Sequence, residues 1–315
     1  MNILLDRGML WLISEVAGVL LLSTGIGLAL KRMVTTEQAT ATVANLNARI
    51  RAWWIMFATF STSLVIGKTG AIILFGLISF LALREFITLI PTRRSDHGAL
   101  LCAFFVITPL QYLFIGMQWY PLLNSLIPLY AFLLIPILGV ASGDYKAFLE
   151  RVSKIQWGVM ICVYCVSHVP ALLGLRIPGY EDQNAKLLCF FVIVVQISDV
   201  LQYVWGKLLG KRKIAPNISP NKTWEGFIGG VGCATLVGTL LWWATPFSPW
   251  QAAGISLAIT LAGFAGGLTM SAIKRDCGVK DFGTIIEGHG GVLDRIDSIC
   301  FAAPVFYHLT KHLLT

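Results

Sequence analysis

Long apolar stretches recur along almost the whole chain and constrain its fold more than any other feature. A helix needs about 20 mostly apolar residues to cross a bilayer, and an isolated backbone polar group is costly there. Hydrophobic residues make up 56% of the chain and charged residues only 13%, which excludes an ordinary soluble domain. The sequence predicts an all-α, polytopic integral membrane protein with nine to ten transmembrane helices, since two of the stretches are short. The ten stretches lie near residues 9–30, 52–66, 69–90, 98–117, 120–142, 156–175, 187–205, 226–247, 251–272 and 298–313.

Basic residues gather in alternate connections between these stretches. Loops rich in lysine and arginine stay on the cytoplasmic side, so the N-terminus is expected outside and the basic loops inside. The compact chain suggests a bacterial inner membrane, and no nucleic-acid partner is expected. The net charge of +8 suits contact with acidic membrane lipids, although the positive-inside bias explains it equally well. Nineteen of the 24 basic residues lie in segments 31–51, 84–97, 143–155, 206–225 and 273–297.

The segment from Ser271 to Asp297 is densely charged, in contrast to the rest of the chain. Charges beside a bilayer are costly unless they are hydrated, paired or bound to metal. Glycines 288, 290 and 291 allow a ligand to approach the backbone closely. The cations would neutralise phosphate oxygens and the carboxylates would hold a divalent metal, so the segment predicts a polar site that faces the cytoplasm. Its titratable residues include Lys274, Arg275, Lys280, Asp281, Glu287, His289, Asp294, Arg295 and Asp297.

This segment resembles the signature of the CDP-diacylglycerol synthase (phosphatidate cytidylyltransferase) family. The signature reads roughly Ser-x-x-Lys-Arg-x4-Lys-Asp-x-Gly-x3-Pro-Gly-His-Gly-Gly-x-x-Asp-Arg-x-Asp, and nearly every fixed position is filled here. A second segment is similar to the family's helix end and following loop, with Asp199, Tyr203, Gly206-Lys207 and Ser219-Pro-Asn-Lys-Thr223. The resemblance covers residues 199–297, about a third of the chain, and a match of this length is far more specific than a lone glycine motif.

The resemblance implies a reaction in which a phosphate oxygen of phosphatidate attacks the α-phosphorus of CTP, giving CDP-diacylglycerol and pyrophosphate. It also implies a homodimer and Mg²⁺, with a second, monovalent cation as an option. The catalytic residues expected from it are Lys274, Arg275, His289, Asp294 and Asp297. The expected substrate-binding residues are Lys207, Ser219, Lys222, Thr223, Ser271, Lys280 and Arg295. The expected metal ligands are Asp294, Asp297, Asp199 and Asp281.

The chemistry is expected in the C-terminal half of the chain. Residues 1–155 are interpreted as N-terminal transmembrane helices, in which no residue suggests catalysis, and residues 156–315 as the catalytic half. Some of the residues also have a plainer interpretation: Asp199 as a hydrogen-bonded carboxylate between helices, and Lys280, Asp281 and Arg295 as an ion-pair network that shapes the loop. Glycines 229, 230, 266 and 267 are expected where spans pack closely.

Two positions depart from the family pattern and leave alternatives open. The family typically has Gly-Asp-Leu-x-x-Ser where this chain has Gly266-Gly267-Leu268, and Pro where it has Glu287. The first change removes a candidate metal ligand, which Glu287 replaces only if the geometry allows. One alternative is an enzyme that joins phosphatidate to another nucleotide donor, such as a UDP-sugar, giving a glycolipid pyrophosphate. Another is a non-catalytic lipid-binding or scaffold paralogue, and a transporter is disfavoured because the early spans hold few polar residues.

Overall fold

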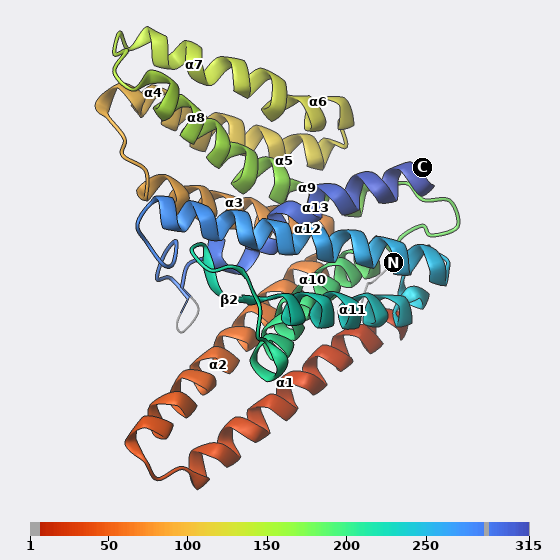
Figure 1. Ribbon diagram of the computed structural model, residues 1–315. Helices are drawn as coiled ribbons and strands as arrows, with labels where there is room; N and C mark the ends of the chain where they lie inside the picture. The colour runs from red at the N-terminus through yellow and green to blue at the C-terminus, as the bar shows by residue number, and fades with distance from the viewer. Residues whose placement is uncertain (1–6, 287–289, 315) are drawn as a thin grey trace.

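The computed structural model describes residues 7–286 and 290–314, and these residues form a helical bundle with one short β-hairpin (Figure 1). This arrangement confirms the predicted all-α, polytopic membrane class. The first part contains α1 (Arg7–Met33), α2 (Glu37–Ile66), α3 (Lys68–Thr88), η2 (Arg94–Asp96), α4 (His97–Cys102), η3 (Ala103–Ile107), α5 (Thr108–Met117), α6 (Tyr120–Ser125), η4 (Leu126–Ala131) and α7 (Phe132–Ala141). The second part contains α8 (Phe148–Val159), η5 (Met160–Cys165), α9 (Val166–Ala171), η6 (Leu172–Gly174), α10 (Asn184–Leu209), β1 (Lys213–Ala215), β2 (Ser219–Thr223), α11 (Trp224–Leu240), η7 (Trp242–Ala244), α12 (Pro249–Asp276) and α13 (Leu293–Leu314).

Each of the ten apolar stretches falls on helical structure. In the described part of the chain, seven helical segments are long and apolar enough to cross a membrane. They are α1, α3, α4 to α5, α6 to α7, α8 to η6, α10 and α12. The other three stretches lie in α2, α11 and α13, so the total number of spans stays a prediction.

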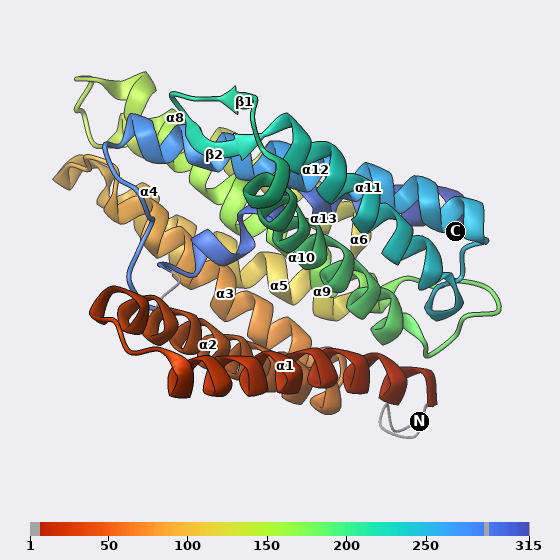
Figure 2. The ribbon, with the colours of Figure 1, turned by 60° about the horizontal axis from the view of Figure 1, so that its bottom comes forward.

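The ends of the helices follow the charge pattern. Both ribbon views place the α1–α2 turn, the α3–α4 and α7–α8 connections, the β-hairpin and the loop after α12 at one end of the molecule (Figures 1 and 2). The start of α1, the end of α13 and the connection before α10 lie at the opposite end. The five basic loops therefore share one side, as the sequence predicts, although which side faces the cytoplasm stays a prediction.

Glycines bring the four C-terminal helices into close contact, as the sequence predicts. A Cβ on Gly230 in α11 would lie 2.6 Å from the backbone nitrogen of Gln202 in α10. A Cβ on Gly266 in α12 would lie 2.9 Å from the backbone oxygen of Asp297 in α13. Only glycine fits such short separations between helices, and these contacts fix the positions of the polar residues at the helix ends.

One buried core includes side chains from both parts of the chain. Phe86 in α3 stacks on Phe282 in the loop after α12, with ring centroids 6.4 Å apart. Phe191 in α10 stacks on Phe306 in α13 at 5.1 Å. The loop that carries much of the charged segment is therefore packed against α3 from the first part.

The β-hairpin lies beside this loop and leads directly into α11. Its strands are antiparallel, with Lys213 opposite Thr223 and Ala215 opposite Ser219. Thr223 ends the hairpin as the N-cap of α11, where its hydroxyl oxygen accepts a hydrogen bond from the backbone N–H of Gly226 (3.1 Å). Such a cap defines where a helix begins, so the hairpin is anchored rigidly next to the α10–α11 contact.

Candidate active site

The start of α13 is organised around Asp294. Oδ2 of Asp294 accepts hydrogen bonds from the backbone N–H groups of Phe282 (2.8 Å) and Gly291 (2.9 Å). Oδ1 accepts one from Nζ of Lys274 in α12 (2.8 Å). The Asp294 side chain is only 2% exposed, and a carboxylate is favoured at a helix N-terminus. Asp294 therefore ties both ends of the loop before α13 to α12.

A second carboxylate reaches the same helix start from α3. Glu85 is buried and accepts hydrogen bonds from the backbone N–H groups of Val292 (2.9 Å) and Leu293 (2.8 Å). These are among the donors that a helix leaves unpaired in its first turn. A Cβ on Gly283 would lie 2.6 Å from Oε1 of Glu85, and one on Gly291 would overlap its carboxylate, so both glycines are needed for this approach.

Asp199 and Asp297 form a pair one turn further into the bundle. Ser298 joins them: its hydroxyl donates to Oδ1 of Asp199 (3.0 Å), and its backbone N–H donates to Oδ1 of Asp297 (2.8 Å). Ser298 thus contacts both carboxylates, and like charges that share a site disfavour each other's ionised form. The plainer interpretation of Asp199, as a hydrogen-bonded carboxylate between helices, accounts for Oδ1, which accepts from Ser298. It does not account for Oδ2.

Lys222 brings a positive charge to this carboxylate pair. Its Nζ lies 4.9 Å from the centroid of the Phe264 ring in α12, a cation–π contact. Burial lowers the pKa of the Lys222 ammonium, while the negative charges of Asp297 and Asp199 act in the opposite direction. The hairpin residue Lys222 therefore shares one electrostatic environment with a carboxylate from α10 and a carboxylate from α13.

Arg275 links the two charged segments directly. Its Nε donates a hydrogen bond to the backbone oxygen of Ile218 (3.2 Å) in the turn of the hairpin. Residues that are 57 positions apart in the sequence are thus joined across the gap between α12 and the hairpin. The two charged segments are therefore neighbours in space.

A family match covers most of the chain. The model of the cytidylyltransferase family matches residues 47–313. The chain belongs to the cytidylyltransferase family. This membership confirms the resemblance found in the sequence and the predicted enzyme class, a nucleotidyltransferase.

Individual members of the family differ in how much they share with this chain. "Uncharacterized protein YnbB" of Escherichia coli (strain K12) is 41% identical over 270 residues, which cover 84% of this chain and 87% of that protein. Phosphatidate cytidylyltransferases of Staphylococcus aureus (strain COL) and Staphylococcus haemolyticus (strain JCSC1435) are 37% and 35% identical over 158 residues. Those matches cover 49% of this chain and 60% of each of those two enzymes.

Several predicted substrate-binding residues lie at the rim of the site. Lys207, at the end of α10, and Lys280, after α12, are exposed. Ser219 begins β2, and the hydroxyl of Ser271 donates back to the Gly267 carbonyl (2.6 Å) within α12. Thr223 is buried and caps α11. Substrate binding by these five residues stays a prediction.

The remaining predicted residues differ in how closely they approach the carboxylate pair. Arg295 is near enough to interact electrostatically with Asp199 and Asp297, and its Nε is buried without a hydrogen-bond partner in the described part of the chain. Asp281 is exposed, with its Cβ close to Gly290. His289, predicted to be catalytic, and Glu287 lie outside the described residues.

The carboxylate pair fits a hard divalent cation. Oδ2 of Asp199 and Oδ2 of Asp297 accept no hydrogen bond from any described residue. No group of three or more His, Cys, Asp or Glu residues suited to a metal occurs within ranges 7–286 and 290–314. Mg²⁺ is commonly held by one or two carboxylates, with phosphate oxygens and water completing its shell. Two free carboxylate oxygens therefore suit a cation that binds together with a phosphorylated substrate.

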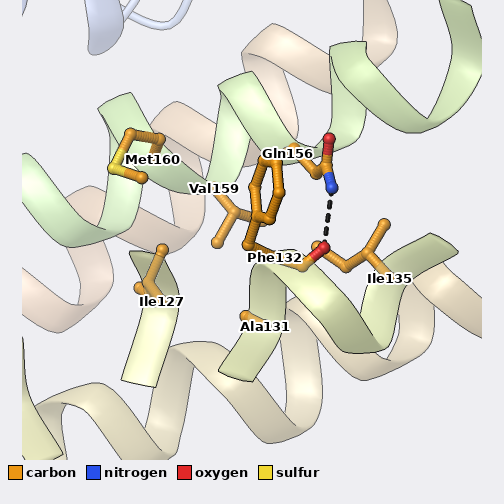
Figure 3. Close-up of a pocket in the computed structure, with 7 residues that line it drawn as sticks. All are labelled: Ile127, Ala131, Phe132, Ile135, Gln156, Val159 and Met160. Carbon is orange, nitrogen blue, oxygen red and sulfur yellow. Dashed lines mark hydrogen bonds between the residues drawn. The ribbon is translucent and has the colours of Figure 1, made fainter. Parts of the chain in front are cut away.

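An apolar pocket elsewhere in the protein lacks the chemistry for a phosphate. It lies between η4 to α7 and α8 to η5, and Figure 3 shows its one polar side chain, Gln156, donating to the backbone oxygen of Phe132 (2.7 Å). Aliphatic and aromatic groups, such as Ile135 and Val159, form the rest of its lining. This pocket does not compete with the charged site as a place for a nucleotide.

Proposed function

We propose that this protein transfers the cytidylyl group of CTP to the phosphate of phosphatidate, giving CDP-diacylglycerol and pyrophosphate. The observation that carries the proposal is the pair Asp199 and Asp297 next to the ammonium of Lys222, which forms no ion pair with any described residue, at the basic end of a membrane-embedded bundle. Relatives named phosphatidate cytidylyltransferase support the choice of both substrates. A site of mixed charge suits this reaction because two polyanions must approach each other.

Each group of residues has a role in this reaction. A phosphate oxygen of phosphatidate attacks the α-phosphorus of CTP, the bond from that phosphorus to the β-phosphate oxygen breaks, and pyrophosphate leaves with the electron pair. Lys222 and Arg295 neutralise the phosphate charges that meet at the carboxylate pair. Lys274 is held by Asp294 at 2.8 Å and keeps a positive charge fixed at the edge of the site.

A divalent cation, with Mg²⁺ expected, would be held by Asp199 and Asp297. When bound, such an ion neutralises and orients the phosphate oxygens during phosphoryl or nucleotidyl transfer. Ser298 orients both carboxylates through its hydroxyl and its backbone N–H, so the protein presets their positions.

The test is an assay of the purified full chain in detergent with labelled CTP, phosphatidate and Mg²⁺. The expected products are CDP-diacylglycerol and pyrophosphate, in equal amounts. Asp297→Asn should reduce turnover at least 100-fold, because it removes a charged ligand for the cation. Asp276→Asn is the matched control, since Asp276 is an exposed carboxylate at the end of α12, and it should retain activity. If the unmodified protein forms no CDP-diacylglycerol from CTP and phosphatidate in the presence of Mg²⁺, the proposal is refuted.

Other nucleotide donors are distinguished in the same assay. Turnover with a UDP-sugar in place of CTP would replace the cytidylyl reaction by glycolipid pyrophosphate synthesis. Binding of CTP or phosphatidate without any turnover would favour a non-catalytic lipid-binding paralogue. Both outcomes are worth measuring because this chain has Gly267 where the family typically has an aspartate, a candidate metal ligand.

The proposed orientation places the site at the cytoplasmic face of the inner membrane. After the seven native cysteines are replaced by serine, one cysteine introduced at Tyr145, in the exposed α7–α8 connection, or at Asp182, in the connection at the opposite end, reports the side. In intact bacterial cells, a membrane-impermeant thiol reagent should label Asp182→Cys and leave Tyr145→Cys unlabelled; the reverse pattern would invert the orientation. We also propose that the protein is a homodimer. Light scattering, corrected for bound detergent, should give a protein mass of two chains.

A further inference from the structure

Gly267 leaves a niche in α12 that the Lys222 ammonium fills. A Cβ placed on Gly267 would lie 2.8 Å from Nζ of Lys222, 3.5 Å from Oγ of Ser298 and 4.0 Å from Oδ2 of Asp297. The niche thus lies between the ammonium on one side and a carboxylate of the pair on the other. Any side chain at position 267 would compete with the ammonium for this space.

The ammonium in the niche is held weakly for a group of its charge. Lys222 is partly buried, and its Nζ makes no hydrogen bond and no close ion pair with any residue in ranges 7–286 and 290–314. Its Nζ lies over the face of the Phe264 ring, 4.9 Å from the ring centroid. An ammonium carries three donors, so a partly buried one that donates to no described residue is poised for a group that supplies acceptors.

The two carboxylates next to the niche each lack a hydrogen-bond donor for one oxygen, just as the ammonium lacks acceptors among the described residues. Asp199 and Asp297 each keep one oxygen that no described residue uses as an acceptor. The attraction of the pair for Lys222 acts through space, without a contact within ion-pair distance. The same negative charge attracts any other cation that enters the site.

We propose that Lys222 is a displaceable counter-ion of the Asp199–Asp297 pair, and that it competes with a divalent cation for these carboxylates. In the absence of phosphate ligands the ammonium stays in the Gly267 niche and weakens cation binding. When a phosphorylated substrate enters, the ammonium leaves the niche to bind phosphate, and the carboxylates become available to the cation. The proposal rests on the proposed function for the identity of the phosphate ligand, but the competition itself does not.

The competition makes cation and phosphate binding mutually supportive. A positive charge several ångströms from a dication in a partly buried site opposes binding of the dication. Moving that charge onto a phosphate removes the opposition, so each ligand improves the site for the other, as linkage requires. Through this competition, the Asp199–Asp297 pair would bind a divalent cation more tightly with a phosphorylated substrate than without one.

The experiment is a Mn²⁺ titration of the purified full chain in detergent, with free Mn²⁺ followed by electron paramagnetic resonance and with no nucleotide or lipid substrate present. Lys222→Met should bind Mn²⁺ roughly tenfold more tightly than the unmodified protein, because a neighbouring like charge is removed. Lys213→Met is the matched control: it removes an exposed lysine from the same hairpin and should change the affinity less than twofold. Asp297→Asn should abolish the site and thereby define background binding.

A second variant keeps the test valid if Lys222→Met fails to fold. Gly267→Ala pushes only the flexible end of the lysine side chain out of the niche, so it should also tighten Mn²⁺ binding. In the double variant the two effects should not add, since both act through the same ammonium. Unchanged or weaker Mn²⁺ binding in both single variants, full additivity, or no specific binding at all would overturn the proposal. Because the titration contains neither CTP nor phosphatidate, an inactive transferase would leave its result intact.

Discussion

Glu85 accepts a hydrogen bond from the backbone N–H of Leu293 at 2.8 Å, across 208 positions of the sequence. The same carboxylate accepts the N–H of Val292, so it caps the start of the helix that carries Asp294 and Asp297. The distance between α3 and the α13 start is thereby fixed by a side chain outside the charged segments. Glu85 is a positioning residue for the proposed site.

Replacing Glu85 separates its role from that of a residue that contacts substrate. Glu85→Ala removes the acceptor from the buried N–H of Leu293 and the partly buried N–H of Val292, at a cost of about 1–3 kcal/mol for a buried group, and should lower both melting temperature and activity. Glu85→Gln keeps one carbonyl acceptor, so its melting temperature and activity should lie between those of the unmodified protein and those of Glu85→Ala. Thermal unfolding in detergent and the assay with CTP and phosphatidate measure the effects, and a Glu85→Ala protein with unchanged melting temperature would contradict this role.

Glycine substitutions test the close approach of the loop to α3. Gly291→Ala places a Cβ into the Glu85 carboxylate, and overpacking of this kind costs about 1–3 kcal/mol. Gly254→Ala is the matched control, since a Cβ there meets no atom within 4 Å and alanine favours a helix. Thermal unfolding should show destabilisation for Gly291→Ala and none for Gly254→Ala; equal melting temperatures would exclude a tight contact.

Asp294 and Asp297 lie three positions apart, but their replacement is predicted to affect stability and turnover differently. Asp294→Asn replaces an oxygen that accepts two backbone hydrogen bonds or one that pairs with Lys274, so it should lower the melting temperature as well as the turnover. Asp297→Asn should lose turnover and Mn²⁺ binding with a smaller loss of stability. Parallel melting curves and Mn²⁺ titrations of both variants measure the difference. Equal stability losses in the two variants would contradict the distinction.

The sequence predicted the elements of this protein because apolar length alone determines where a helix can cross a bilayer. All ten apolar stretches lie on helices, and the basic loops lie at one end. The motifs also suggested that the two charged segments approach each other, and a Cβ on Gly267 would lie 2.8 Å from Nζ of Lys222 and 4.0 Å from Oδ2 of Asp297. These predictions rest on local composition and on spacing, which a single sequence displays directly.

Contacts between distant segments were not predictable in the same way. Glu85 was missed, although the pair Arg84-Glu85 at the end of an apolar stretch was a signal that a charge is retained there for a reason. The hydrogen bonds of Asp294 depend on how the loop folds back, and no spacing rule encodes that path. Gly267 was interpreted as the loss of a ligand, whereas the structure also gives it a spatial role next to Lys222.

The connection between α7 and α8 provides a pH-dependent test of stability outside the site. Asp144 accepts hydrogen bonds from the backbone N–H of Lys146 and from the side chains of Ser95, Arg93 and Arg151. These contacts, the Lys146 N–H first among them, lower the pKa of the Asp144 carboxyl to about 2, against about 3.9 in an unfolded chain. Because the folded pKa is the lower one, the stabilisation is complete above pH of about 4 and is lost as the pH falls towards 2.

Asp144→Asn should therefore lower the melting temperature at pH 6 and have a smaller effect at pH 3. Thermal unfolding in detergent at both values gives the comparison, with Asp182→Asn as the control. Asp182 is an exposed carboxylate in the connection at the opposite end of the bundle, so its replacement should change the melting temperature little at either pH. A deficit of Asp144→Asn that stays constant between pH 6 and pH 3 would show that the ionised carboxylate contributes nothing, because protonation of Asp144 in the unfolded chain should remove about half of its stabilisation by pH 3.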